Sequence, residues 1–151
     1  MAHIGVFIER YTIAESGEMG ALMRLGQVAH RLGHRLDVLF RPEMYKIPQY
    51  DALLIRALTD PLNSSYVAAR LAQMHGLRVI DTPESIVICC DKVNMYRHLQ
   101  RAEVPMPRSE FVDERDLTLA RAEQLFDEMG TPLVLKAPNS SFSLYVEKVS
   151  T

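Results

Sequence analysis

The chain has 151 residues, 48% of them hydrophobic, which suffices for the core of one domain or of one domain and part of a second. Lys and Arg number 17 against 19 Asp and Glu, and the net charge of -2 comes without a basic block, so nucleic acid is not expected as a partner. No apolar run approaches the roughly 18 residues of a membrane span and no signal peptide is visible, so we expect a cytoplasmic protein without a membrane partner.

Short apolar segments alternate with amphipathic ones in the first part of the chain. Strands are predicted at 4–8, 35–40, 52–55 and 77–80. Helices are predicted at 16–32, which Gly33 ends, and at 64–74, which Asn63 can cap. The segment that contains Pro42 and Pro48 is predicted to be a loop. The alternation indicates an α/β fold, with a small Rossmann-like parallel-sheet domain at 1–82.

A dinucleotide site is not expected in this domain. Such a site needs the glycines of G-x-G-x-x-G directly after the first strand, so that the backbone can approach a pyrophosphate. The chain has Glu9-Arg10-Tyr11-Thr12-Ile13-Ala14 at that place, and Gly17 and Gly20 come too far along. Neither NAD nor FAD is therefore expected as a cofactor.

Arg56 follows the predicted strand 52–55 directly. Ligands of open α/β sheets bind at the carboxyl ends of the strands, where a guanidinium can hold a carboxylate through two hydrogen bonds. We therefore name Arg56 as a candidate substrate-binding residue. A surface salt bridge explains an arginine at this position equally well.

Neither the cysteines nor the histidines predict a metal site. Cys89 and Cys90 are adjacent, which suits neither a disulfide nor a zinc site, so they are predicted to be small buried apolar residues. His30 and His34 are four residues apart on a predicted helix, but no third ligand is evident nearby. No metal ligand and no catalytic residue is assigned.

The second part, 83–151, begins after Pro83 and has a different pattern. Helices are predicted at 84–90, 91–102 and 116–129, and a strand at 109–112. Asp91 is expected to cap the helix that follows it. A β-rich run ending at Lys136 and a second one ending at Val149 predict a hairpin.

The hairpin has the composition of a phosphate-binding site. Lys136 provides a cation in an apolar strand, and the loop after it offers hydroxyl and backbone donors. The candidate loop residues are Ser140, Ser141 and Ser143. Two plainer interpretations stay open: a lysine that extends to solvent from an edge strand, and an ordinary polar hairpin loop.

Four segments occur in an order and spacing that resemble the ATP-grasp superfamily. They are Val79–Ile86, Cys90–Lys92, Leu99–Pro107 and Pro132–Lys136. The similarity is strongest to carboxylate-amine ligases of the glutathione synthetase and ribosomal-protein glutamate ligase type. These families have an Asp-Lys pair at a helix start, a V-P-x-P segment, and a lysine strand that leads into a flexible loop. The domain at 1–82 fits their Rossmann-like first domain.

The resemblance implies that Lys92 and Lys136 lie near the phosphates and the adenine end of an ATP site. ATP and Mg²⁺ would be the cofactors of the complete enzyme, which activates a carboxylate as an acylphosphate for attack by an amine. The stretch Asn139–Ser143 lacks the glycines usual in the family, which reduces the conformations open to the loop.

The resemblance covers only the beginning of the ATP-grasp domain, so 83–151 is expected to be incomplete. The 151 residues alone are then expected to be inactive and to bind ATP weakly or not at all. The alternative is a non-catalytic binding or assembly module, in which the Rossmann-like domain and the strand edges of the hairpin contact a partner such as a second copy of the chain.

Overall fold

The computed structural model describes residues 1–14, 16–141 and 143–150, and it consists of two compact units, Met1–Cys90 and Asp91–Thr151. Helix α4 (Pro83–Cys89) belongs to the first unit, since Ile86 lies in the core of that unit. The domain boundary between residues 82 and 83 that the sequence suggests stays a prediction.

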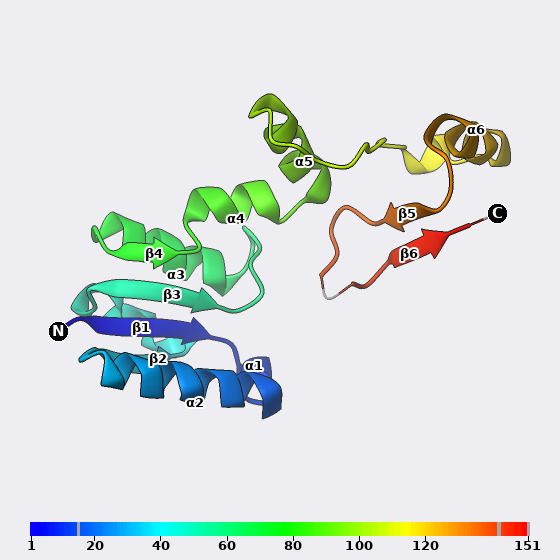
Figure 1. Cartoon of the computed structure of the whole chain (residues 1–151). Coiled ribbons are helices and arrows are strands. Elements are labelled where there is room, and N and C mark those ends of the chain that lie inside the picture. Colours follow the sequence, from blue (N-terminus) through cyan, green and yellow to red (C-terminus); the bar gives the residue numbers. More distant parts are fainter. Residues whose placement is uncertain (15, 142, 151) are drawn as a thin grey trace. The chain divides into compact units, whose positions relative to one another are not determined.

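Four parallel strands form the sheet of the first unit (Figure 1). They are β1 (His3–Ile8), β2 (Arg35–Leu39), β3 (Ala52–Arg56) and β4 (Arg78–Ile80), in the spatial order β2-β1-β3-β4. In the central strand, Phe7 is in register with Leu39 on one side and with Ile55 on the other. The four predicted strands and the α/β class with its parallel sheet are confirmed.

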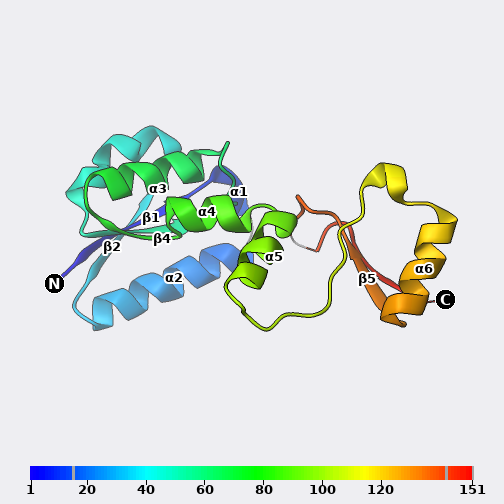
Figure 2. The same cartoon turned by 90° about the horizontal axis from the view of Figure 1, so that it is seen from above.

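Helices cover both faces of this sheet. Figure 2 shows α2 (Ser16–Arg31) on one face and α3 (Ser64–Met74) on the other, and both predicted helices are confirmed. Gly33 and Gly76 follow them with φ of 76° and 74°, a conformation that favours glycine. A short helix that the sequence did not predict, α1 (Arg10–Ala14), follows β1. Among the described residues, no helix is long and apolar enough to cross a membrane.

The core of the first unit is divided between the two faces of the sheet, because successive side chains of a strand point to opposite sides. On the α2 face, Val6 and Ile8 pack with Leu22. The larger cluster, on the α3 face, consists of Phe7, Leu39, Ile47, Tyr50, Leu53, Ile55, Ala68, Ala69, Ala72, Val79 and Ile86. The three alanines of this cluster all lie on α3, and their small side chains let the helix pack close to the strands.

Gly5 in β1 has no room for a side chain. A Cβ atom there would lie 2.8 Å from Cδ1 of Leu39 and 3.1 Å from Cδ1 of Leu53, both in the larger cluster. Because Gly5 has no side chain, Leu39 of β2 and Leu53 of β3 can pack directly against the backbone of β1.

A charged network lies at the amino end of the same strands. The Asp37 carboxylate is 2.8 Å from Nε2 of His3 and accepts hydrogen bonds from the Arg35 guanidinium at 3.1 Å. Burial raises the pKa of Asp37, but the hydrogen bonds from Arg35 and His3 and the charges of both outweigh burial and hold this pKa below its usual value.

This pKa predicts an acid-dependent contribution to stability. A carboxyl whose pKa is lower in the folded state than in the unfolded chain stabilises the fold above its unfolded pKa of about 4, and the contribution is lost as the pH falls through the folded value. The Asp37→Asn variant should therefore lose less of its free energy of unfolding than the wild type between about pH 5 and 2. Urea unfolding followed by circular dichroism would measure the free energy of unfolding at each pH. Asp127→Asn, at an exposed position, is the control. Equal acid dependence in wild type and Asp37→Asn would contradict the prediction.

The predicted loop around Pro42 and Pro48 is wrong, since the segment forms a 3₁₀ helix, η1 (Arg41–Gln49). Pro42 lies in the first turn of this helix, where proline is tolerated because the amide N–H it lacks would have no helical partner, whereas Pro48 lies inside the helix, one residue before its end. The Glu43 carboxylate also accepts a hydrogen bond from the Phe40 N–H at 3.2 Å, which caps the start of this helix.

The predicted strand at 109–112 is also wrong, because residues 104–113 have neither helix nor strand. Pro105 and Pro107, just before this segment, have no N–H to donate to a neighbouring strand, and the Ser109 hydroxyl donates to the Pro107 carbonyl at 3.0 Å. The predicted helix 116–129 begins later, as α6 (Leu119–Met129), because the Thr118 side chain caps it.

The second unit has little protected interior. It consists of α5 (Lys92–Arg101), the 3₁₀ turn η2 (Glu114–Asp116), α6, and the antiparallel pair β5 (Leu133–Lys136) and β6 (Val146–Val149). The predicted hairpin is confirmed, with Lys136 opposite Val146. None of the described residues of this unit is fully buried, and Val134 and Leu135 are 56% and 52% exposed. A two-stranded sheet of this kind is only marginally stable without further packing.

Candidate functional site

The candidate site of the second unit is built on the start of α5. The helix begins at Lys92 because the Asp91 carboxylate accepts a hydrogen bond from the Asn94 N–H at 2.7 Å, so Asp91 is a cap, as expected. Lys92 is thereby fixed at the first helical position, where backbone N–H groups have no partner within the helix.

Lys92 contacts the loop that follows β5. Its ammonium donates to the carbonyl and the hydroxyl oxygen of Ser140, at 2.6 and 2.8 Å, and lies 3.4 Å from the Pro138 carbonyl oxygen. The backbone N–H of Lys92 donates to the same Pro138 carbonyl at 3.1 Å. The structure therefore brings together Lys92 and Ser140, two residues that the sequence named separately.

Lys136, the last residue of β5, is exposed. Its ammonium lies 3.4 Å from the hydroxyl oxygen of Tyr96 and 5.9 Å from the centre of that ring. Tyr96 is one turn beyond Lys92 on α5 and contacts Phe111 edge-on, with 6.4 Å between the ring centres. The sequence prediction missed Tyr96, although its spacing of four residues from Lys92 was the signal that could have found it.

The loop of the hairpin closes without glycine. The Ala137 N–H donates to the Tyr145 carbonyl and the Leu144 N–H to the Ser141 carbonyl, both at 3.0 Å. Ser143 and Tyr145 have φ of 59° and 54°, in the left-handed region that non-glycine residues rarely adopt. Phe142 lies outside the described residues. The predicted loop residues Ser140, Ser141 and Ser143 thus lie in the segment that connects β5 and β6, and their part in ligand binding stays a prediction.

At the carboxyl end of the sheet in the first unit, Arg56 forms an ion pair. Its Nη2 atom lies 2.8 and 2.7 Å from the two carboxylate oxygens of Glu18, in the first turn of α2. The Ser64 hydroxyl donates to the Glu9 carboxylate at the same edge. The surface salt bridge named as the alternative for Arg56 is thus present, and the substrate role stays a prediction.

The cysteines differ from expectation, and the histidines do not form a pair. Cys89 is exposed and Cys90 half-buried, because both lie where α4 ends at the limit of the first unit, so the prediction that they are buried is wrong.

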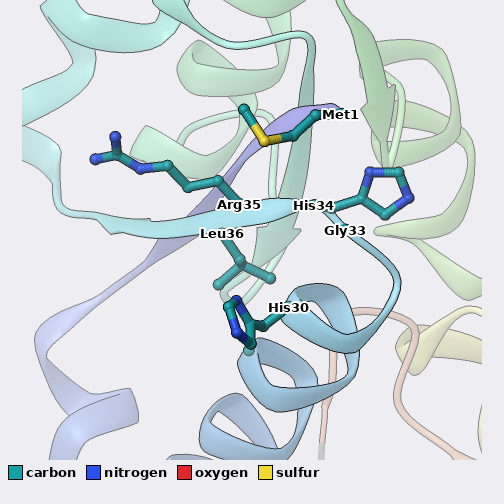
Figure 3. A pocket seen from close by; sticks show the side chains of 7 residues that line it. Met1, His30, Gly33, His34, Arg35 and Leu36 are labelled. Carbon is teal, nitrogen blue, oxygen red and sulfur yellow. The ribbon is translucent and has the colours of Figure 1, made fainter.

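Figure 3 shows the rings of His30 and His34 at separate places in a pocket at the amino end of the sheet. The His34 ring accepts a hydrogen bond from the Ala2 N–H at 3.1 Å. The described residues contain no cluster of three potential metal ligands.

Comparison with solved structures identifies the fold. The RimK-domain ATP-grasp protein from Sphaerobacter thermophilus matches 99% of this chain with a TM-score of 0.64 and 19% identity. The ATP-grasp fold is confirmed. D-alanine–D-alanine ligase from Bacillus anthracis matches all of the chain (100%) with a TM-score of 0.63 and 19% identity, and its complex with ATP matches with a TM-score of 0.57.

Sequence comparison agrees with the structures. Glutamate–LysW ligase ArgX from Sulfolobus acidocaldarius is 26% identical over 101 residues, which are 67% of this chain and 34% of that protein. No family model matches the chain. The chain covers 54% of the RimK-domain protein and 50% of the D-alanine–D-alanine ligase, so it spans about half of the length of these solved structures. The resemblance to ATP-grasp carboxylate-amine ligases is therefore confirmed.

Proposed function

We propose that this chain supplies the first part of an ATP-dependent carboxylate-amine ligase. In such an enzyme, ATP converts a carboxylate into an acylphosphate, and an amine then displaces the phosphate. The observation that carries the proposal is the contact of Lys92 with Ser140, together with the exposed ammonium of Lys136, in a chain whose fold matches about half of a RimK-domain ATP-grasp protein. The predicted alternative, an assembly module, has no observation in its favour beyond the exposed hairpin.

The donor groups of the second unit suit the phosphates of ATP. The Lys136 ammonium is exposed, and the loop after it contains the hydroxyls of Ser141 and Ser143. The Ser140 hydroxyl already donates to the Ala137 carbonyl at 3.2 Å, so a phosphate would have to replace that contact or use the backbone N–H of Ser140. An ammonium and a set of hydroxyls can hold phosphate oxygens through charge-assisted hydrogen bonds. These residues therefore fit the phosphate end of a nucleotide.

The same residues do not fit a magnesium site. Mg²⁺ prefers carboxylate and phosphate oxygens, and the described residues contain no cluster of three acidic or imidazole ligands. In the complete enzyme the metal would neutralise charge on the phosphates, and we propose that acidic groups outside the described residues hold it.

A carboxylate substrate is proposed to approach Arg56. Ligands of parallel sheets bind at the carboxyl ends of the strands, which is where Arg56 and Glu18 form their exposed ion pair. A substrate carboxylate would take the place of Glu18 and accept hydrogen bonds from the guanidinium. Because the pair is half exposed, an incoming carboxylate can reach the guanidinium.

Titration with Mg-ATP tests the nucleotide part of the proposal. Since the proposed site would reach only the phosphates, we expect a dissociation constant of about 1 mM or weaker for these 151 residues. Isothermal titration calorimetry, with NMR for weak binding, would measure it. Micromolar binding would contradict a partial site, and no detectable binding at about 20 mM would remove the support for a nucleotide site.

A further inference from the structure

Strand β2 lies at one edge of the sheet in the first unit, and among the described residues no strand pairs with its outer side. The Arg35 N–H donates to the Ala2 carbonyl at 2.9 Å, so the backbone groups of Arg35 point toward β1. In a parallel pair, successive residues of a strand alternate in the side to which their N–H and C=O groups point. The backbone groups of Leu36 and Val38 therefore point away from β1, where they can pair with another strand.

The side chains of Leu36 and Val38 lie on the α2 face of the sheet. Leu36 packs against the cluster that contains Val6, and Val38 is in register with Val6. Val38 is nevertheless 39% exposed. Beside Leu36 lies the pocket of Figure 3, a hollow of about 460 Å³ that Gly26 and Gly33 also line. A Cβ atom at either glycine would meet no atom within 4 Å, so the hollow is open.

The charges of β2 lie on the opposite face and are complementary to those of a second copy of the strand. Figure 3 shows the side chains of Arg35 and Leu36 leaving β2 in opposite directions. If two copies pair antiparallel about a two-fold axis at Leu36, Arg35 of each copy lies opposite Asp37 of the other. An axis at Asp37 would instead place two carboxylates opposite each other, which is destabilising. The charges therefore favour the register centred on Leu36, which is self-complementary as a two-fold contact requires.

From these features we propose that β2 pairs antiparallel with β2 of a second copy of this chain, so that the two sheets continue as one. In the register centred on Leu36, Val38 of one copy lies opposite His34 of the other, where it enters the hollow that His34 and Leu36 line. Such a dimer suits a ligase and a non-catalytic module equally. The proposal therefore goes beyond the proposed function and does not rest on it.

Sedimentation velocity of the 151-residue chain at increasing concentration tests the dimer. Because a contact through one short strand is small, we expect a dissociation constant of about 100 μM, with single chains at about 5 μM and mostly dimers at about 1 mM. Val38→Lys should weaken dimerisation at least about tenfold, since the hollow would have to bury a charge. Ile80→Lys is the matched control, because Ile80 is an exposed residue of β4 at the other edge of the sheet, and it should dimerise like the wild type.

Amide hydrogen exchange in the wild-type chain gives a second measurement that needs no variant. If exchange occurs from the single chain, the amides of Leu36 and Val38 should exchange about threefold more slowly at 1 mM than at 50 μM, whereas the Ile80 amide should not change. A wild-type chain that stays single at 1 mM would overturn the proposal. So would a dimer that Val38→Lys leaves intact or that Ile80→Lys disrupts, or exchange at Leu36 and Val38 that does not depend on concentration.

Discussion

Replacing Ile86 with alanine is expected to lower the free energy of unfolding of the first unit by about 2–5 kcal/mol. The Ile86 side chain is 1% exposed and packs in the cluster that contains Phe7, Leu53 and the alanines of α3. Truncation removes buried methyl groups and leaves a cavity that a close-packed core fills only in part. Urea unfolding monitored by circular dichroism would measure the change.

The neighbouring residue is the control for this prediction. Val87 is 43% exposed and lies on the same helix, so Val87→Ala should change the free energy of unfolding by less than about 1 kcal/mol. If Ile86→Ala were as mild as Val87→Ala, α4 would not pack on the sheet in solution, and the first unit would end before Pro83.

The second large effect is expected at Lys136. Replacing Lys136 with methionine keeps an unbranched side chain but removes the charge that the proposed function places against a phosphate. Loss of a charge-assisted hydrogen bond of about 1.5–3 kcal/mol corresponds to roughly 10- to 100-fold weaker Mg-ATP binding. Titration followed by NMR shifts would measure it, with Lys148→Met in the same hairpin as the control. Equal affinity of Lys136→Met and the wild type would exclude Lys136 as the phosphate cation.

Much of the first unit could be predicted because its signals are local. Apolar runs such as 4–8 indicate buried strands, and Gly33 and Gly76 mark helix ends through a backbone conformation that suits glycine. The 3₁₀ helix η1 was missed because its prolines are typical of loops, while the cap provided by Glu43 depends on side-chain geometry.

The second unit was harder to predict from local pattern. The segment 109–112 has β-forming residues, but a strand needs a partner, and pattern alone does not show whether one is present. The exposure of Cys89 likewise depends on where the first unit ends, which residue type does not reveal.

The candidate site was predicted as separate residues and not as an arrangement. Lys92, Lys136 and Ser140 were named, but the contact of Lys92 with Ser140 joins residues 48 positions apart, and composition and spacing do not determine such a contact. Tyr96 was missed because an aromatic residue on an amphipathic helix is usually a packing residue. For Arg56, both the ligand role and the salt bridge could be predicted, and only the structure shows Glu18 as its partner.

Under the proposed function, Lys136 and the loop residues Ser140, Ser141 and Ser143 form the phosphate end of an ATP site. Mapping of backbone amide NMR shifts in the wild-type chain during titration with Mg-ATP tests this claim most directly. The proposal predicts that the largest shifts fall on Lys136, Ala137 and Ser140 and that they weaken in Lys136→Met. Shifts confined to the pocket at His30 and His34, or shifts unchanged in Lys136→Met, would contradict it.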